Sequence, residues 1–419
     1  MSNTNKKSLF VDFSLLLSHR NFRNIFIARS ISILSLGMLS VSIPVQVYSL
    51  TSDSLQVGIV MALEGFGLFV GLLLGGVLAD IYERRRLILI ARTTCGIGFA
   101  AMAINAWLPD PSLIAIYALS IWDGFFGAIG ITALMASMPF IVGRENLMQA
   151  RAISMVSVRL ATVISPAIGG IIIAFSDVAW NYLIATIGTG ITVLTLLTLP
   201  KMQPQNVQSH NPLKSLWDGF TYILTNKIVA SVILVGTLVT LTTAIRVLFP
   251  ALADKMYGGS AWVTGLMYSA VPLGATLGAI ISGWANHVNK PGVVMMLTAI
   301  ASFLCIMGIG STLYFPVVLL LLAAFGYLVS IASLLQYSFV QGHTPDNYLG
   351  RINGIWTAQN ASGDSLGTLT IGALGKFISP LSSIFVFGAV AAGSGVLMLS
   401  FLKTLRNSPL TNPELVEKD

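Results

Sequence analysis

Five charged residues lie within stretches of the chain that are otherwise almost entirely apolar: Glu64, Asp123, Arg159, Arg246 and Asp364. A charged side chain at the centre of a bilayer costs about 2.5–3.5 kcal/mol on insertion scales, so its presence there needs a chemical reason. Desolvation in a membrane cavity favours the neutral carboxyl group, which would let an acid load and release protons near neutral pH. We therefore predict proton-coupling roles for Asp123 and Asp364 first, and for Glu64.

The two arginines carry the opposite charge. Arg159 and Arg246 could pair with the acids, or they could bind an oxygen-rich solute. The alternative for each charge is a structural ion pair buried between helices. The sequence leaves open which residues pair.

Polar and aromatic residues gather in the apolar stretches 112–140, 315–341 and 352–375. Flat rings beside amide groups suit a cavity for a large, hydrogen-bonding solute, although interface anchoring and core packing are the alternative. With the two arginines, the predicted cavity residues are Arg159, Arg246, Trp122, Phe126, Gln336, Tyr337, Trp356, Gln359 and Asn360.

Other kinds of chemistry find no support in the sequence. The four histidines are scattered, and the two cysteines lie in apolar stretches, so we expect neither a metal site nor a disulfide framework. The chain contains no GxxxxGK[ST] loop to bind ATP. We therefore expect no cofactor and no enzyme activity, and movement of a solute would have to draw on an ion or substrate gradient.

The elements that must position these residues are membrane helices. Hydrophobic residues make up 55% of the chain and charged residues 9%, against about 25% charged residues in soluble proteins. Apolar blocks long enough to cross a bilayer predict an all-α membrane protein with twelve transmembrane helices. The predicted spans are 24–50, 57–79, 87–107, 112–140, 151–175, 180–199, 228–252, 262–285, 292–312, 315–341, 352–375 and 381–402.

The distribution of charge predicts the topology. A net charge of +7 could suggest nucleic acid as a partner. Instead, most Lys and Arg residues fall in the two termini and in alternate loops, while the opposite loops carry Asp53, Asp110, Asp177 and Asp254. By the positive-inside rule both termini are cytoplasmic, which requires an even number of spans.

The chain is also internally repeated. Adding 207 to the positions of five glycines in one apolar block reaches small residues of another. Gly58, Gly67, Gly71, Gly75 and Gly76 correspond to Gly265, Gly274, Gly278, Ser282 and Gly283. Small residues at four-residue spacing let helices approach closely in lipid. Two parallel membrane repeats predict two six-helix bundles around a central cavity, the architecture of a secondary transporter.

These features divide the chain into five parts. A Pro/Gln/Asn-rich stretch separates the halves and precedes an amphipathic helix near 213–224. The predicted parts are a cytoplasmic N-terminus at 1–23, an N-terminal bundle at 24–199, a cytoplasmic linker at 200–225, a C-terminal bundle at 226–403 and a cytoplasmic tail at 404–419.

The loop after the second span reads GGVLADIYERRR. It resembles the signature loop of the Major Facilitator Superfamily at Gly76, Asp80, Arg84 and Arg85. An acid at a helix end and arginines near helix C-termini can hold one conformation closed, so we predict a conformational latch. Ile81 and Glu83 depart from the pattern, and the second-half copy has His287 in the acidic position. A plain topogenic basic loop is the alternative.

The fifth span contains the sequence SPAIGG, which resembles the G-P-x-x-G-G motif of exporters in the same superfamily. Pro166 removes a backbone hydrogen bond and bends the helix, and Gly169 and Gly170 allow close packing at the bend. Ser165 replaces the usual first glycine. The motif favours export, with an ordinary kinked span as the alternative.

Longer stretches extend the resemblance from about Leu15 to Thr404, among them IWDGFFGAIGITALMA (121–136) and LGRINGIWTAQNASGD (349–364). They resemble the enterobactin exporters within the superfamily. This resemblance implies alternating-access export of a small catecholate siderophore across the cell inner membrane, with an outer-membrane channel completing secretion. The acids within the spans predict protons as the coupling ion, and the distribution of charge argues against nucleic acid as a partner. A multidrug proton antiporter for hydrophobic compounds is the main alternative, and a membrane enzyme or a gated channel is less well supported.

Overall fold

The computed structural model describes residues 13–143, 145–202 and 220–411, which form helices and turns without strands. The first half comprises α1 (Ser14–Ser18), α2 (Arg20–Thr51), α3 (Ser54–Ile81), α4 (Arg84–Trp107), α5 (Leu113–Val142), α6 (Leu147–Phe175) and α7 (Val178–Leu196). The second half comprises α9 (Lys227–Thr243), η1 (Ala244–Leu248), α10 (Phe249–Met256), α11 (Ala261–Ile281), η2 (Ser282–His287), α12 (Pro291–Ile309), α13 (Phe315–Gly342), α14 (Asp346–Phe377), α15 (Pro380–Phe401) and α16 (Lys403–Asn407).

In the described part of the chain, eleven helical segments are long and apolar enough to cross a membrane. The remaining predicted span, 352–375, which is the eleventh in chain order, falls in α14. This helix is long enough at 32 residues but too polar to be counted with the others. A polar helix is tolerated at membrane depth where it lies against protein, and α14 packs on α3, α9 and η1. The predicted all-α membrane fold of two six-helix bundles is confirmed.

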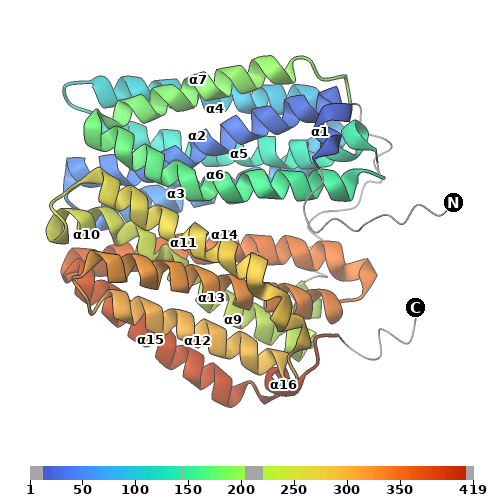
Figure 1. Ribbon diagram of the computed structural model, residues 1–419, viewed down its shortest axis with the longest axis vertical. Helices are drawn as coiled ribbons and strands as arrows, with labels where there is room; N and C mark the ends of the chain where they lie inside the picture. The colour runs from blue at the N-terminus through green and yellow to red at the C-terminus, as the bar shows by residue number, and fades with distance from the viewer. Residues whose placement is uncertain (1–12, 144, 203–219, 412–419) are drawn as a thin grey trace.

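The two halves lie one above the other in Figure 1. Helices α1 and α16 lie at one end of the molecule, here called the terminal end, and α10 lies at the opposite end, here called the α10 end. The predicted amphipathic linker helix and the residues before Phe13 fall largely outside the described residues.

The halves meet along two seams, one between α3 and α14 and one between α6 and α11. A Cβ on Gly58 would lie 2.4 Å from the carbonyl oxygen of Thr368, and one on Gly265 would lie 2.6 Å from that of Pro166. Gly58 and Gly265 are the first pair matched by the internal repeat. The repeat therefore places the same residue type at both seams, where only glycine allows the backbones to touch.

Repeated glycines further along the same helices pack within each half. A Cβ on Gly71 would lie 2.3 Å from the carbonyl oxygen of Phe125 in α5, and one on Gly274 would lie 1.8 Å from that of Ala323 in α13. The second helix of each half is thus pressed backbone to backbone against the fourth, as the spacing of small residues predicted.

Candidate functional site

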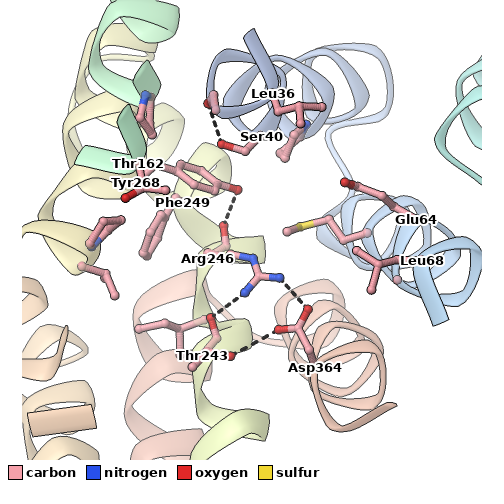
Figure 2. A pocket seen from close by; sticks show the side chains of 18 of the residues that line it. Leu36, Ser40, Glu64, Leu68, Thr162, Thr243, Arg246, Phe249, Tyr268 and Asp364 are labelled. Atoms are coloured by element: carbon pink, nitrogen blue, oxygen red, sulfur yellow. Dashed lines mark hydrogen bonds and ion pairs between the residues drawn. The ribbon is translucent and has the colours of Figure 1, made fainter. Parts of the chain in front are cut away.

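A cavity of about 520 Å³ lies between the two halves. Its walls come from α2, α3 and α6 of the first half and from α9, η1, α10, α11 and α14 of the second. Figure 2 shows the side chains that converge on it. Its volume is within the range of sites that enclose drug-sized ligands, about 300–1,000 Å³.

An ion pair forms the polar wall of this cavity. Arg246 Nη2 lies 2.6 Å from Asp364 Oδ2, and the hydroxyl of Thr243 donates to Asp364 Oδ1 at 3.2 Å. The side chains of Arg246 and Asp364 remain 31% and 25% exposed. The pair is therefore a satisfied charge centre that a solute in the cavity can still reach (Figure 2).

The local backbone explains how Arg246 reaches the cavity. The span that contains it is broken by the 3₁₀ segment η1, and Pro250 follows four residues later. Proline has no N–H to donate to the carbonyl of Arg246. The backbone N–H of Phe249 and the hydroxyl of Tyr268 donate to that carbonyl instead, the hydroxyl at 2.9 Å. A break in a transmembrane helix is tolerated because a neighbouring side chain satisfies the freed group.

The same spacing recurs around the cavity. Its lining includes three more residues that each precede a proline by four positions, so that their carbonyls also lack the usual helical donor. These pairs are Ser40 and Pro44 in α2, Thr162 and Pro166 in α6, and Tyr268 and Pro272 in α11. Main-chain bends from both halves thus surround one cavity.

Glu64 also lines the cavity, from α3, which packs against the helix that carries Asp364 (Figure 2). Its carboxylate forms no hydrogen bond or ion pair with any residue of the described chain, and it interacts electrostatically with Asp123, Arg246 and Asp364. The cavity therefore holds two acids and one arginine, and one of the acids has no direct partner.

The rest of the lining is mainly apolar. Phe249 and Tyr268 pack edge to face with ring centroids 5.1 Å apart, and Leu36 and Leu68 face them from the first half. Flat rings and apolar groups can pack against such walls, while Ser40 and Thr162 add hydroxyl groups. Sequence reasoning missed Phe249, Tyr268, Ser40 and Thr162. The signal that could have found three of them is a proline four residues downstream.

Asp123 lies apart from this cavity. It is 6% exposed on α5, where its electrostatic partners are Arg92 and Cys95 of α4. Arg92 donates to the hydroxyl of Ser32 at 2.8 Å, and Asp123 Oδ1 has no hydrogen-bond partner among the described residues. The three predicted proton-coupling acids therefore occupy two places, with Glu64 and Asp364 in the cavity and Asp123 buried inside the first half.

Of the nine predicted cavity residues, Arg246 lines this cavity and the other eight do not. In the first half, the rings of Trp122 and Phe126 pack at a tilt of 53°, with centroids 4.7 Å apart, and Trp122 donates to the carbonyl of Thr94 at 2.8 Å. Arg159 is half-buried on α6.

The predicted cavity residues of the second half lie on α13 and α14. Tyr337 stacks on Trp356 at 5.7 Å. Asn360 accepts a hydrogen bond from Thr240 at 3.1 Å, and Gln336 and Gln359 lie against Gly236. These side chains form part of the packing between α9, α13 and α14.

The described contacts of the predicted latch loop stay within the first half. Arg84 stacks over Phe140 at 4.5 Å, and Arg85 donates to the carbonyl of Leu197 at 2.6 Å. Open space surrounds the position where a Cβ on Gly76 would stand. The side chain of Asp80 lies outside the described part of the structure.

The predicted kink motif of α6 lies both at the cavity and at the seam between α6 and α11. Pro166 lines the cavity, and a Cβ on Gly170 would lie 2.6 Å from the carbonyl oxygen of Ala261 in α11. The carbonyl of Gly169 accepts a hydrogen bond from Asn181 at 2.9 Å. The bend in α6 and its contact with the other half are therefore adjacent.

Comparison with known proteins gives the family. The enterobactin exporter EntS of Escherichia coli K12 is 48% identical over 415 residues, which cover 99% of this chain and 100% of the relative. The solved nucleoside transporter NupG superposes with a TM-score of 0.73 at 16% identity, covering 93% of this chain and 100% of that one. A POT family transporter in complex with a thioalcohol-conjugated peptide superposes with a TM-score of 0.72 at 15% identity, covering 92% and 96%. These two likenesses concern the fold alone. The sequence pattern of the Major Facilitator Superfamily matches residues 25–368, and the chain belongs to that family.

Proposed function

We propose that this protein exports the catecholate siderophore enterobactin from the cytoplasm to the periplasm across the inner membrane. The observation that carries the proposal is the 48% identity to the enterobactin exporter EntS over essentially the whole of both chains. An outer-membrane channel would then complete secretion, because the product is released between the two membranes.

The chemistry of the cavity supports this substrate. Enterobactin carries three catechol rings, whose hydroxyl groups are hydrogen-bond donors. Glu64 and Asp364 offer carboxylate acceptors, and Phe249 and Tyr268 offer flat apolar contact. The ion pair leaves Arg246 able to exchange its partner for an oxygen of the solute.

Alternating access follows from the two seams in this proposal. We place the α10 end toward the periplasm and both termini in the cytoplasm, because the loops at the α10 end carry the acidic residues and the opposite loops the basic ones. The glycine contacts and an ion pair between Lys376 and Asp53, at 3.2 Å, join the halves toward the α10 end. Rocking of the two halves about the cavity would open that end and close the other. The kink at Pro166 and the loop with Gly76, Asp80, Arg84 and Arg85 would assist this movement.

Proton antiport supplies the energy in this scheme. A proton entering from the periplasm would bind Asp364 or Glu64, and protonation of Asp364 would remove its charge attraction for Arg246. The carboxyl group would also stop accepting hydrogen bonds from the catechols, so the substrate would be released to the periplasm. After the protein returns to the cytoplasm-facing state, the proton would leave, and the carboxylate would be restored for the next substrate molecule. Asp123, near Glu64 and Arg92, is a second candidate for the same role.

The test is uptake of labelled enterobactin into inside-out membrane vesicles, whose lumen corresponds to the periplasm. An acidic lumen should drive uptake, and a protonophore should abolish it. If uptake does not depend on the pH gradient, the protein is not a proton antiporter. If no enterobactin is taken up at all, enterobactin is not its substrate.

A multidrug antiporter is the second candidate function, favoured by the mainly apolar lining of the cavity. It predicts that unrelated hydrophobic dyes compete with enterobactin for uptake in the same vesicles. A siderophore exporter predicts competition from catechol compounds only.

A further inference from the structure

A line of polar side chains runs from the cavity into the interior of the second half, where α9, α13 and α14 meet. At the cavity, the hydroxyl of Thr243 donates to Asp364. One turn further along both helices, the hydroxyl of Thr240 donates to Asn360 Oδ1 at 3.1 Å. Beyond this pair lie Gln336 and Gln359. We call the line from Asp364 to these two glutamines the polar seam.

The two glutamines at the far end face one spot. A Cβ on Gly236 would lie 3.0 Å from Gln336 Oε1 and 3.7 Å from Gln359 Oε1. The absence of a side chain at Gly236 therefore leaves room where the two amides converge. Gln336 is only 3% exposed, and Gln359 is partly exposed.

The amide groups are not satisfied by the protein. Gln336 Nε2, Gln359 Nε2 and Gln359 Oε1 are buried and have no hydrogen-bond partner among the described residues. Each unsatisfied buried polar atom costs about 1–3 kcal/mol, and lipid supplies no partner. These two donors and one acceptor, on neighbouring side chains, are groups that water can serve, because water accepts from donors, donates to acceptors and needs about 2–4 polar partners.

We propose that the polar seam binds ordered water between Gln336, Gln359 and Asp364, and that this water carries the proton of Asp364 toward the terminal end. This inference rests on the proposed proton antiport. The proton leaves the Asp364 carboxyl group for a water of the seam and passes from water to water, and the carboxylate left behind pairs again with Arg246. The amides and hydroxyls orient the water and keep their own protons.

The charged and titratable groups that face Asp364 agree with this direction. They are Arg246 on η1, Tyr268 on α11 and Glu64 on α3, and all of them line the cavity. The seam itself contains only neutral amides and hydroxyls. A proton that leaves through the seam therefore avoids the volume that the substrate occupies, so both can be bound and released on separate paths.

The test separates proton movement from substrate movement. Gln336→Leu and Gln359→Leu remove the polar groups that hold the water. Uptake of labelled enterobactin into acid-lumen vesicles should fall about tenfold or more, as expected when a proton relay is lost. Exchange of labelled for unlabelled enterobactin at equal pH does not require net proton transfer and should stay within about twofold of the unmodified protein.

The matched control is Gln341→Leu. Gln341 also joins α13 to α14, but it donates to Asn353 at 3.1 Å and lies outside the seam. This variant should retain gradient-driven uptake. Gly236→Ala is a second way to disturb the spot, because it places a methyl group against Gln336 Oε1 without removing a polar group. It should slow gradient-driven uptake and spare exchange, even if the leucine variants fail to fold.

The outcomes are distinct. Equal losses in uptake and exchange, or no loss in either, would overturn the water path while leaving siderophore transport intact. If the unmodified protein exchanges enterobactin but ignores the pH gradient, antiport itself is wrong and this inference falls with it.

Discussion

Arg246 and Asp364 stabilise each other across the boundary between a broken helix and α14, and the cavity keeps both partly accessible. A buried ion pair that loses one partner costs about 3–5 kcal/mol, because the remaining charge is uncompensated. Exposure of 31% and 25% reduces that cost here, since water in the cavity can solvate the charge that remains. Substitutions at this pair should therefore affect function more than folding.

Asp364→Asn should leave the protein folded, with a loss of about 1–3 kcal/mol in the free energy of unfolding. It should abolish enterobactin uptake driven by a pH gradient, because an amide neither takes up the proton nor attracts Arg246. Thermal unfolding in detergent and vesicle uptake measure the two effects. Asp364→Glu, which keeps the carboxylate, serves as the control. Full gradient-driven uptake by Asp364→Asn would contradict a coupling role for this residue.

Glu64→Gln should change the stability very little, because the carboxylate has no hydrogen-bond partner to lose among the described residues. If Glu64 binds the transported proton, the number of protons exchanged per enterobactin should fall, as measured with a pH-sensitive dye in the vesicle lumen. Asp110→Asn removes an equal charge from an exposed loop and should leave that ratio unchanged. An unaltered ratio in Glu64→Gln would assign coupling to Asp364 or Asp123.

Charge in lipid was the informative signal at this scale. Because a charged side chain in a membrane is energetically unfavourable, only five residues were candidates for charged functional groups. The structure places three of them, Glu64, Arg246 and Asp364, together in one cavity. Aromatic residues carried no such signal, because they are equally suited to lipid, to core packing and to a cavity. This is why Trp122 and Tyr337 were predicted to line it while Phe249 and Tyr268 do so.

Individual helices contain two features with opposite effects: glycines that allow tight helix packing, and prolines that interrupt the helical hydrogen bonds. The glycine contacts were predictable from four-residue spacing and from the repeat. The break at η1 was not, because its residues Ala244–Leu248 contain neither glycine nor proline, and its cause lies downstream at Pro250. Helical periodicity also could not assign the cavity face, since both the lipid-facing and the protein-facing sides of these helices are apolar.

Gly170→Leu should weaken the seam between α6 and α11. A Cβ at this position would lie 2.6 Å from the carbonyl oxygen of Ala261 and 2.8 Å from the Cα of Gly265, so the helices must separate. We expect the α10 end to open, which would increase the labelling of a cysteine introduced near that seam by a membrane-impermeant reagent. Gly393→Leu in α15 has open space around its Cβ and should not increase labelling. Equal labelling of both variants would show that this seam does not hold the α10 end closed.

At the scale of the whole molecule, the contacts between the halves near the α10 end include an ion pair. Lys376 Nζ in α14 lies 3.2 Å from Asp53 Oδ2 in the turn between α2 and α3, with side-chain exposures of 45% and 19%. An ion pair this exposed contributes at most about 1 kcal/mol, which is still a fivefold change in a two-state equilibrium.

Lys376→Glu should therefore shift the population toward the state open at the α10 end by about fivefold. Spin labels placed in each half at that end would measure the distance distribution. Asp53→Lys combined with Lys376→Glu restores an attractive pair and should restore the closed population. High salt should reproduce part of the effect in the unmodified protein. If the closed population is the same in the single variant, in the double variant and at high salt, the glycine contacts alone keep the α10 end closed.

The two-bundle architecture was the most predictable feature of the molecule. The sequence is duplicated, and the duplication repeats the same small residues at both seams. The way the halves meet was not predictable, since the partner of each glycine depends on the fold of the other half. Gly58 meets Thr368 and Gly265 meets Pro166, and nothing in the local sequence of Gly58 or Gly265 names these partners.

The proline bends around the cavity have a consequence for how such a transporter can diversify. Ser40, Thr162 and Tyr268 each present a carbonyl that lacks the donor normally supplied four residues later. A main-chain acceptor survives any side-chain substitution at its own position. Drift at Leu36, Leu68 or Phe249 could therefore reshape the pocket for differently sized aromatic cargo, while the prolines preserve an affinity for hydroxyl-rich molecules.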